Sequence, residues 1–276
     1  MSTKLRADVA LVNSGLVSSR EKAQSLIMAG KVYYNEKKII KASENVQFLD
    51  KLSIKGKTHG YVGRGALKLE KALKVFNLSV EGCIGLDIGA ATGGFTDVLL
   101  QNGAKHVYAV DVGYGQLDWK IRNDSRVTVF ERTNARYLTN EQIPITPDIT
   151  VMDVSFISIK LLLPIAAKLM ENKGIFSVLI KPQFEAGKQY VGKKGVVKDP
   201  KVHQMVIEQI HEFLPTIGYY MHQLDYSPIT GPEGNIEYIT VFRPLTSKDE
   251  GLTEITKENI EKIVSSAHIN LSIKSE

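Results

Sequence analysis

Residues 86–97 read LDIGAATGGFTD and contain the strongest local signal for the fold. The first residues of this stretch are apolar and predict a strand, the small residues after them predict a tight turn, and a helix is expected to begin near Phe95. A turn of glycine, alanine and threonine lets a ligand approach the backbone closely, and amides at the start of a helix can face polar groups. The spacing of Gly89, Gly93 and Gly94 does not match the dinucleotide-binding motif, and a phosphate-binding loop is absent too, because Lys51 stands where the first glycine before the run GKT at 56–58 should be. This stretch therefore predicts a site for a nucleotide-like cofactor.

Strands and helices alternate from Cys83 onward. Apolar runs predict seven strands over residues 84–88, 106–111, 127–130, 149–153, 175–181, 219–226 and 236–242, and helical spacing predicts helices over residues 95–101, 160–170 and 202–214. This alternation predicts an α/β fold with a Rossmann-like sheet of seven strands, whose ligand lies beyond the carboxyl ends of the strands. The polar tail, residues 246–276, predicts a further amphipathic helix that packs on the sheet or binds a partner, with its apolar face formed by Leu252, Ile255, Ile260, Ile263 and Val264.

Length and composition are those of an ordinary folded protein. The chain has 276 residues, of which 43% are hydrophobic and 24% charged, and this excludes disordered, collagen-like and disulfide-stapled classes. The single cysteine, Cys83, excludes an internal disulfide and a thiolate zinc cluster, and six scattered histidines show no metal-ligand spacing. The first eight residues lack the apolar core of a signal peptide, and no run approaches the roughly 20 apolar residues of a membrane span. We therefore expect a cytoplasmic protein with no metal and no membrane attachment.

Positive charge is concentrated in the first sixty residues. They carry 11 lysines and arginines against 5 acidic residues, whereas the rest of the chain carries 24 basic and 25 acidic residues. This asymmetry favours a polyanionic partner for the amino-terminal segment, although a basic face that serves only solubility would explain it equally well.

The same segment predicts a small α+β unit of two helices followed by a hairpin. Ser18 and Glu21 form a capping-box pattern at the start of the second helix, Gly30 stops it, and residues 31–40 read as a strand, a polar turn and a second strand. This order, with GLVSSREKAQ at 15–24 and AGKV at 29–32, resembles the S-four RNA-binding module. The resemblance implies contacts to RNA, largely to its phosphates. The residues implied in them are Arg6, Arg20, Lys22 and Lys31.

Asp111 ends the strand that follows the glycine turn, 24 residues after Asp87. An acidic side chain at that place can accept hydrogen bonds from ribose hydroxyls. Together with the glycine spacing, the two aspartates resemble the S-adenosylmethionine site of Rossmann-like methyltransferases. A plainer reading, with Asp87 as a helix cap and Asp111 as a turn residue, explains each aspartate but not their placement on adjacent strands. The resemblance implies a set of cofactor-binding residues: Asp87, Gly89, Ala90, Ala91, Thr92, Gly93, Gly94, Phe95, Asp111, Val112 and Asn134.

Four further charged residues stand where the sheet is expected to bring them together. Asp153 and Lys181 end apolar strands, Glu237 lies early in another strand, and Lys68 precedes the first strand. A charged side chain seldom ends a buried strand without a partner, although each one singly is also explained as a snorkelling lysine or a surface carboxylate. Together the four resemble the Lys-Asp-Lys-Glu tetrad of ribose 2′-O-methyltransferases of the FtsJ-like fold, and this resemblance implies that all four are catalytic.

The chemistry of methyl transfer to a hydroxyl fits these residue types, because a weakly acidic alcohol must lose its proton as it attacks the methyl carbon. Lysine titrates near about 10.4. Lys181 can therefore act as a base only if a neighbouring cation such as Lys68, or desolvation, lowers its pKa; otherwise it orients the oxygen and stabilises its negative charge. The run DVSF at 153–156 differs from the Asp/Asn-Pro-Pro-aromatic run of enzymes that methylate base amino groups. Phe156 is expected to stack on an RNA base or to pack.

Over nearly its whole length the chain resembles the TlyA family, through RGALKL at 64–69, DVSFIS at 153–158 and KPQFE at 181–185. The resemblance implies S-adenosylmethionine-dependent 2′-O-methylation of cytidine in the ribosomal RNA of ribosomal subunits, with Arg64 as a further RNA contact. It implies an RNA-binding domain over residues 1–58, a linker over 59–62 and a methyltransferase domain over 63–276. His59, Tyr61 and Gly63 depart from residues common in relatives. Two alternatives stay open, a ribosome-assembly factor without turnover and, from the older family name hemolysin, membrane lysis.

Overall fold

The computed structural model describes residues 4–17, 19–35, 37–54, 60–250 and 252–272. The chain divides into two compact units, residues 1–60 and residues 61–276. Of the linker residues singled out in the sequence, His59 lies outside the described residues and Tyr61 belongs to the second unit. Among the helices of the described residues, none has the length and apolar character needed to cross a membrane.

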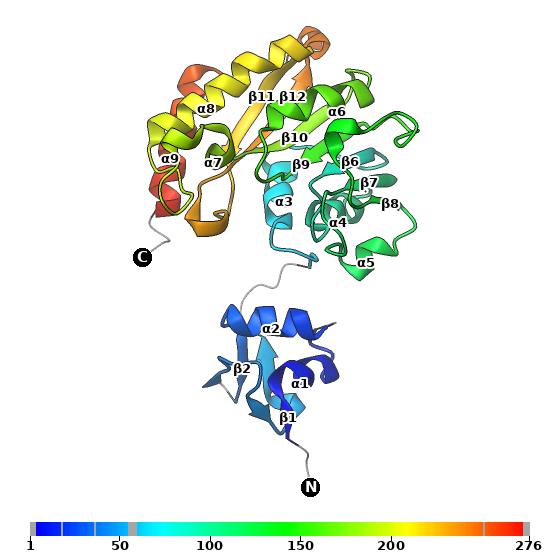
Figure 1. Ribbon diagram of the computed structural model, residues 1–276, viewed down its shortest axis with the longest axis vertical. Coiled ribbons are helices and arrows are strands. Elements are labelled where there is room, and N and C mark those ends of the chain that lie inside the picture. The colour runs from blue at the N-terminus through cyan, green and yellow to red at the C-terminus, as the bar shows by residue number, and fades with distance from the viewer. Residues whose placement is uncertain (1–3, 18, 36, 55–59, 251, 273–276) are drawn as a thin grey trace. The chain divides into compact units, whose positions relative to one another are not determined.

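The amino-terminal unit contains the two predicted helices and the predicted hairpin (Figure 1). Its helices are α1 (Ala7–Asn13) and α2 (Arg20–Met28), and its strands are β1 (Leu5–Arg6), β2 (Val32–Tyr34), β3 (Lys37–Lys38), β4 (Asn45–Val46) and β5 (Leu52–Ile54). Strand β2 pairs with β3 and β5, and β1 pairs with β4, all antiparallel. A small apolar core fills the unit, with Leu11, Ile27 and Val32 among its members. The predicted cap is corrected: Ser19, which accepts a hydrogen bond from the Lys22 amide, caps α2, and Ser18 lies outside the described residues.

The second unit is built on the predicted Rossmann-like sheet of seven strands. They are β6 (Ile84–Ile88), β7 (His106–Val110), β8 (Val127–Phe130), β9 (Ile149–Met152), β10 (Ile175–Ile180), β11 (Tyr219–Tyr226) and β12 (Tyr238–Pro244). Their order in the sheet is β11-β12-β10-β9-β6-β7-β8. Neighbouring strands are parallel except at β12, which runs antiparallel to both β10 and β11. All residues of β6 are buried, as expected for a parallel strand covered on both faces.

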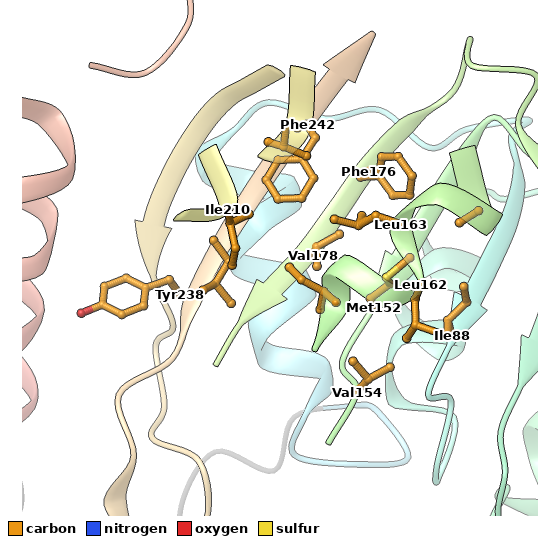
Figure 2. Packing of buried hydrophobic residues seen from close by; sticks show 14 of the residues in the cluster. Ile88, Met152, Val154, Leu162, Leu163, Phe176, Val178, Ile210, Tyr238 and Phe242 are labelled. Atoms are coloured by element: carbon orange, nitrogen blue, oxygen red, sulfur yellow. The ribbon is translucent and has the colours of Figure 1, made fainter. Parts of the chain in front are cut away.

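Helices cover both faces of this sheet (Figure 1). They are α3 (Ala66–Val75), α4 (Gly94–Gln101), α5 (Trp119–Arg122), α6 (Leu163–Leu169), α7 (Pro182–Glu185), α8 (Pro200–Phe213) and α9 (Lys257–Ser272). The 3-10 turns of this unit are η2 (Ala135–Tyr137), η3 (Ile159–Leu161), η4 (Lys188–Tyr190), η5 (Leu214–Ile217), η6 (Pro232–Gly234) and η7 (Leu245–Glu250), and η1 (Leu49–Lys51) belongs to the amino-terminal unit. Alternate residues of β10 serve the two faces: Phe176 and Val178 belong to the core under α6, α8 and α9, and Leu179 to the core under α3 and α4. Figure 2 shows the first of these cores, with Phe176 near Phe242 and Val178 near Met152.

Several boundaries differ from the sequence prediction by one or two residues, and three differences have a local reason. The expected helix 160–170 is divided into η3 and α6, with Pro164, which has no amide hydrogen, in the first turn of α6. The tail helix begins at Lys257, and Thr256, just before it, exchanges hydrogen bonds with Asn259. Leu252 and Ile255 therefore precede the helix and do not belong to its apolar face. Strand β12 begins at Tyr238, so Glu237 stands just before the strand rather than within it.

Candidate functional site

The sheet brings the four charged residues of the predicted tetrad to one edge. Asp153 follows the last residue of β9, and Lys181 follows the last residue of β10. Strand β12 runs antiparallel to β10, with Tyr238 opposite Ile180, so the start of β12 and the preceding Glu237 lie at the edge where β10 ends. Lys68 reaches the same place from the first turn of α3.

The four side chains form a continuous chain of ion pairs. Lys68 Nζ lies 3.1 Å from Asp153 Oδ2 and 2.7 Å from Glu237 Oε2, and Lys181 Nζ pairs with Asp153 Oδ1. Lys68 and Lys181 are each only 6% exposed, and Glu237 is fully buried. The charges of two lysines and two carboxylates therefore balance in a site that is largely shielded from solvent. Buried charges are tolerated when they are paired in this way.

The charge states of two members follow from these contacts. Burial favours the neutral amine of Lys68, but the carboxylates of Asp153 and Glu237 outweigh it and raise its pKa. Burial likewise favours the protonated form of Asp153, but Lys68 and Lys181 outweigh it and lower its pKa. Lys68 is thus a fixed cation and Asp153 a fixed anion at neutral pH.

Two polar residues to which sequence reasoning assigned no role complete the tetrad's hydrogen bonds. Lys181 Nζ donates to Ser155 Oγ at 3.2 Å, and Gln183 Nε2 donates to Glu237 Oε1 at 3.1 Å. Both residues lie within two positions of a tetrad member, so their closeness in sequence is the signal by which they could have been found. They hold Lys181 and Glu237 from the sides that the ion pairs leave open.

The glycine turn lies directly against this cluster. Gly89 adopts a left-handed conformation (φ 86°), and a Cβ added to it would lie 3.1 Å from the Asp153 carbonyl oxygen and 3.0 Å from the Val154 side chain. Only glycine fits this approach. The turn that was predicted to hold a cofactor and the residues predicted to be catalytic therefore share one edge of the sheet.

Asp87 and Asp111 both hold this turn in place, from different sides. Asp87 is fully buried and accepts hydrogen bonds from the Thr96 amide (3.0 Å) and hydroxyl (2.7 Å) at the start of α4, and its burial raises its pKa to about 7. The structure thus places Asp87 beneath the turn, as the helix-cap reading expects. Asp111 accepts from the Ala91 amide at 2.8 Å and from the Gly113 amide at 2.7 Å, and it stays partly exposed.

The other predicted cofactor residues divide into a surface and a support. Ala91, Thr92 and Val112 are exposed beside Asp111, and Asn134 is half-buried with its side chain accepting from the Arg136 amide. The remaining ones are buried and shape the turn from below: Ala90, Gly93, Gly94 and Phe95. A left-handed glycine turn, an acid after the next strand and an exposed apolar residue beside it are features that fit an adenosine-containing cofactor. No cluster of three or more potential metal ligands occurs in the part of the chain that the structure describes.

The segment that leads into α3 contacts the same turn. The Val62 amide donates to Asp97 Oδ2 at 2.9 Å, and a Cβ added to Gly63 would lie 2.6 Å from Thr92 Oγ1. The glycine at position 63 therefore lets the chain pass close to Thr92.

Phe156 stands at the rim of the tetrad and is 92% exposed. It adopts a left-handed conformation (φ 63°), which is rare for an aromatic residue, and its ring centroid lies 5.0 Å from that of Phe184. Lys181 Nζ lies 5.8 Å from the centre of the Phe184 ring. An exposed ring in a strained conformation is what the stacking role predicts, whereas the contact with Phe184 is what the packing role predicts.

The predicted RNA-binding residues of the amino-terminal unit are in part organised by a buried acid that sequence reasoning did not single out. Asp8 is fully buried and receives hydrogen bonds from Arg6, Arg20 and Gln24. Lys22 is exposed on α2 and Lys31 is half-buried before β2. Arg64, in the second unit, is exposed and donates to the Thr230 carbonyl at 3.3 Å.

Comparisons with known proteins agree with this geometry. The model of the FtsJ-like methyltransferase family matches residues 61–243, and that of the S4 domain matches residues 5–52. The chain is 43% identical to the 16S/23S rRNA (cytidine-2′-O)-methyltransferase TlyA of Mycobacterium tuberculosis over 249 residues, which are 90% of this chain and 93% of the relative. It is 49% identical to YqxC of Bacillus subtilis, provisionally named an rRNA methyltransferase, over 99% of this chain and 97% of the relative. A solved structure from Streptococcus thermophilus, provisionally named a hemolysin, is 42% identical with a TM-score of 0.78 and covers 99% of both chains.

Proposed function

The chain belongs to the FtsJ-like methyltransferase family, and on that premise we propose that it transfers methyl groups from S-adenosylmethionine to the ribose 2′-oxygen of a cytidine in ribosomal RNA. The observation that carries the proposal is the tetrad, in which Lys68 is clamped between Asp153 and Glu237 while Lys181 pairs with the other oxygen of Asp153. The presence of an S4 domain supports RNA as the substrate. Ribosomal subunits in the cytoplasm are the proposed partners.

The glycine turn and Asp111 are the proposed cofactor site. When bound, S-adenosylmethionine supplies a methyl group activated by a positively charged sulfur. Asp111 would accept hydrogen bonds from its ribose, and the exposed Ala91 and Val112 with the half-buried Asn134 would line the place of its adenine. The shape of the turn, which lets a ligand lie against its backbone, is proposed to depend on Asp87, Ala90, Thr92, Gly93, Gly94 and Phe95. Gly89 lies where this turn contacts Asp153.

Lys181 is the residue proposed to act on the target hydroxyl. Both lysines are equally buried, but Lys181 pairs with a single carboxylate and has an aromatic ring and Ser155 beside it, whereas Lys68 lies between two carboxylates. Because its pKa is raised, Lys68 stays charged and cannot serve as the base. We assign to Lys181 the orientation of the 2′-oxygen and the stabilisation of its negative charge while the hydroxyl proton passes to solvent. Asp153 fixes both lysines, and Glu237 fixes Lys68.

Phe156 is proposed as the platform for the base of the target nucleotide. Reaching a ribose within a folded RNA requires that the nucleotide leave its stack, and an exposed aromatic ring replaces the lost stacking. Arg6, Arg20, Lys22 and Lys31 of the amino-terminal unit, and Arg64, are proposed to hold phosphates of the surrounding RNA.

A methylation assay tests the proposal. Purified 30S and 50S subunits are incubated with the protein and methyl-labelled S-adenosylmethionine, and the label is mapped by nuclease digestion to single nucleotides. Label should appear on the 2′-oxygen of a cytidine. Lys181→Ala should abolish it while leaving the cofactor Kd, measured by calorimetry, unchanged, and the exposed Lys168→Ala on α6 serves as the control.

Four results would count against the proposal. Label on a base rather than a ribose, or no label in either subunit, excludes the reaction. Full activity of Lys181→Ala excludes the assigned role of that lysine. Rescue of ribosome assembly in cells by the inactive variant would favour the alternative of an assembly factor without turnover.

A further inference from the structure

A second concave surface lies beside the tetrad. It is a groove of about 1480 Å³ lined by the turn at residues 190–199, the segment 228–236 that leads into β12, two residues of α9, and Arg64. Its volume exceeds the roughly 300–1,000 Å³ of a typical small-molecule pocket. The groove therefore suits an extended ligand better than a compact one.

The groove begins where the tetrad ends. Ile236, which lines it, is followed directly by Glu237, and the Gly231 backbone lies so close to the Glu237 carboxylate that a Cβ on Gly231 would overlap it. On the other wall, Arg64 precedes Lys68 by four residues and bonds to the Thr230 carbonyl across the groove. A polymeric ligand with one of its residues at the tetrad can thus continue into the groove without leaving the protein surface.

The groove is cationic. Its basic residues are Arg64, Lys193, Lys194 and Lys198, and its acidic residues are Glu233 and Asp199. Asp199 is engaged in capping α8, where it accepts from the Lys201 amide at 2.9 Å. The three lysines are exposed, and within the described part of the chain none of them forms an ion pair with a carboxylate. Their charges are therefore available to an anionic ligand.

The turn that carries the lysines is fixed to the body of the unit at two places. Buried Asn235 donates to the Gly195 carbonyl at 3.0 Å and accepts from the Val197 amide at 3.3 Å. Buried His203 donates through Nε2 to the Val197 carbonyl at 2.9 Å, while its Nδ1 accepts from the Tyr238 hydroxyl at 2.8 Å. A lysine turn held in this way loses less conformational freedom when it binds a ligand than a free loop would.

We propose that this groove binds the RNA strand adjoining the methylated nucleotide, with Lys193, Lys194, Lys198 and Arg64 at its phosphates. The inference rests on the proposed function, because a ribose held at Lys181 has phosphates on both of its sides, and the groove is a cationic surface continuous with that point. Phosphate contacts of this kind fix the register of the strand and do not read its sequence.

The test compares two triple variants of the full-length protein that lose the same charge. The groove variant carries Lys193→Gln, Lys194→Gln and Lys198→Gln. The control carries Lys105→Gln, Lys168→Gln and Lys173→Gln, three exposed lysines near the opposite edge, where β7 and β10 begin. Binding to deproteinised ribosomal RNA and to intact subunits is measured over a range of salt concentrations, together with KM, kcat and the Kd for S-adenosylmethionine.

The groove variant should bind RNA with a salt dependence less steep by about 2 on a log–log plot, since each phosphate contact to a single strand contributes about 0.7. Its KM for subunits should rise about tenfold or more, with kcat and the cofactor Kd changed by less than about twofold, and the control should behave as the wild type. Equal slopes and KM values for the two variants would overturn the inference. A loss seen with subunits but not with deproteinised RNA would overturn it too, because the occupant would then be a ribosomal protein. A wild-type protein that methylates no RNA refutes the proposed function, whereas the RNA-binding slopes still test the groove.

Discussion

Asp8→Asn should weaken RNA binding although it makes the amino-terminal unit more positive. The Asp8 carboxylate receives five hydrogen bonds: Oδ1 from Arg6 Nε (3.0 Å) and the Val9 amide (3.0 Å), and Oδ2 from Arg6 Nη2 (3.1 Å), Arg20 Nη2 (2.9 Å) and Gln24 Nε2 (3.0 Å). The Arg6 guanidinium and its hydrogen bonds keep the pKa of Asp8 well below its usual value, so the carboxylate is charged at any pH of interest. It holds two arginines in one place while leaving each about half exposed (49% and 53%).

The magnitude follows from the bonds that an asparagine can keep. Its single oxygen replaces at best Oδ2, and its amide nitrogen then faces the donors at Oδ1, so at least the bonds from Arg6 Nε and Val9 are lost. At about 1 kcal/mol for each bond, the unit loses about 2 kcal/mol of unfolding free energy. The neutral amide oxygen also holds Arg6 and Arg20 less strongly than the carboxylate does, and ordering both side chains on RNA then costs about 0.5–1.5 kcal/mol each. Because solvent screens half-exposed guanidiniums, the lower part of this range applies, and we expect RNA affinity to fall about 5- to 20-fold.

Fluorescence anisotropy with a ribosomal RNA fragment measures this change, and circular dichroism at the same temperature establishes that the variant is folded. Glu21→Gln is the control, because it removes the same charge from an exposed position next to Arg20. Net charge alone predicts that both variants bind RNA at least as tightly as the wild type. A folded Asp8→Asn protein that binds as well as Glu21→Gln would refute the idea that Asp8 pre-organises the arginines.

Three further predictions concern the second unit. Glu237→Gln leaves Lys68 with one carboxylate, and we expect kcat in single-turnover methylation to fall about 100-fold with unchanged cofactor affinity; a fall below about threefold would contradict the role of Glu237. Phe156→Ala should reduce kcat/KM for subunits about 5- to 150-fold, the worth of about 1–3 kcal/mol of stacking, without lowering the melting temperature; an equal loss of stability would instead indicate packing. Because burial raises the pKa of Asp87 to about 7, the wild type should lose unfolding free energy as the pH rises from about 4 to 7, by about 4 kcal/mol relative to Asp87→Asn, and the two proteins should show the same pH dependence below about pH 4. Denaturant unfolding at several pH values measures this difference, and parallel curves would refute it.

Local patterns were sufficient for most of the elements. The alternation of apolar runs predicted the seven strands of the sheet, because a strand buried on both faces needs a continuous apolar run wherever it lies. Helix α3 was not predicted, although it carries Lys68. It begins after Gly65 without a side-chain cap, and the burial of Ala66, Leu69 and Leu73 against α4 and the sheet stabilises it instead. Such packing is not visible in a local window of sequence.

Local sequence patterns were enough to identify a strand, a glycine turn and a helix for a cofactor, charged residues at the ends of apolar strands, and a basic amino-terminal unit. Which of these residues contact one another depends on the fold. Lys68 and Glu237 are 169 residues apart in the chain and 2.7 Å apart in space, and only the reversed direction of β12 brings Glu237 to the edge where β9 and β10 end. The burial of Asp8 and the continuity of the tetrad with a lysine-lined groove also depend on the fold. Hydrophobic periodicity and turn residues reflect interactions among a few neighbouring residues. Burial and charge pairing instead depend on distant segments that come together only when the sheet forms.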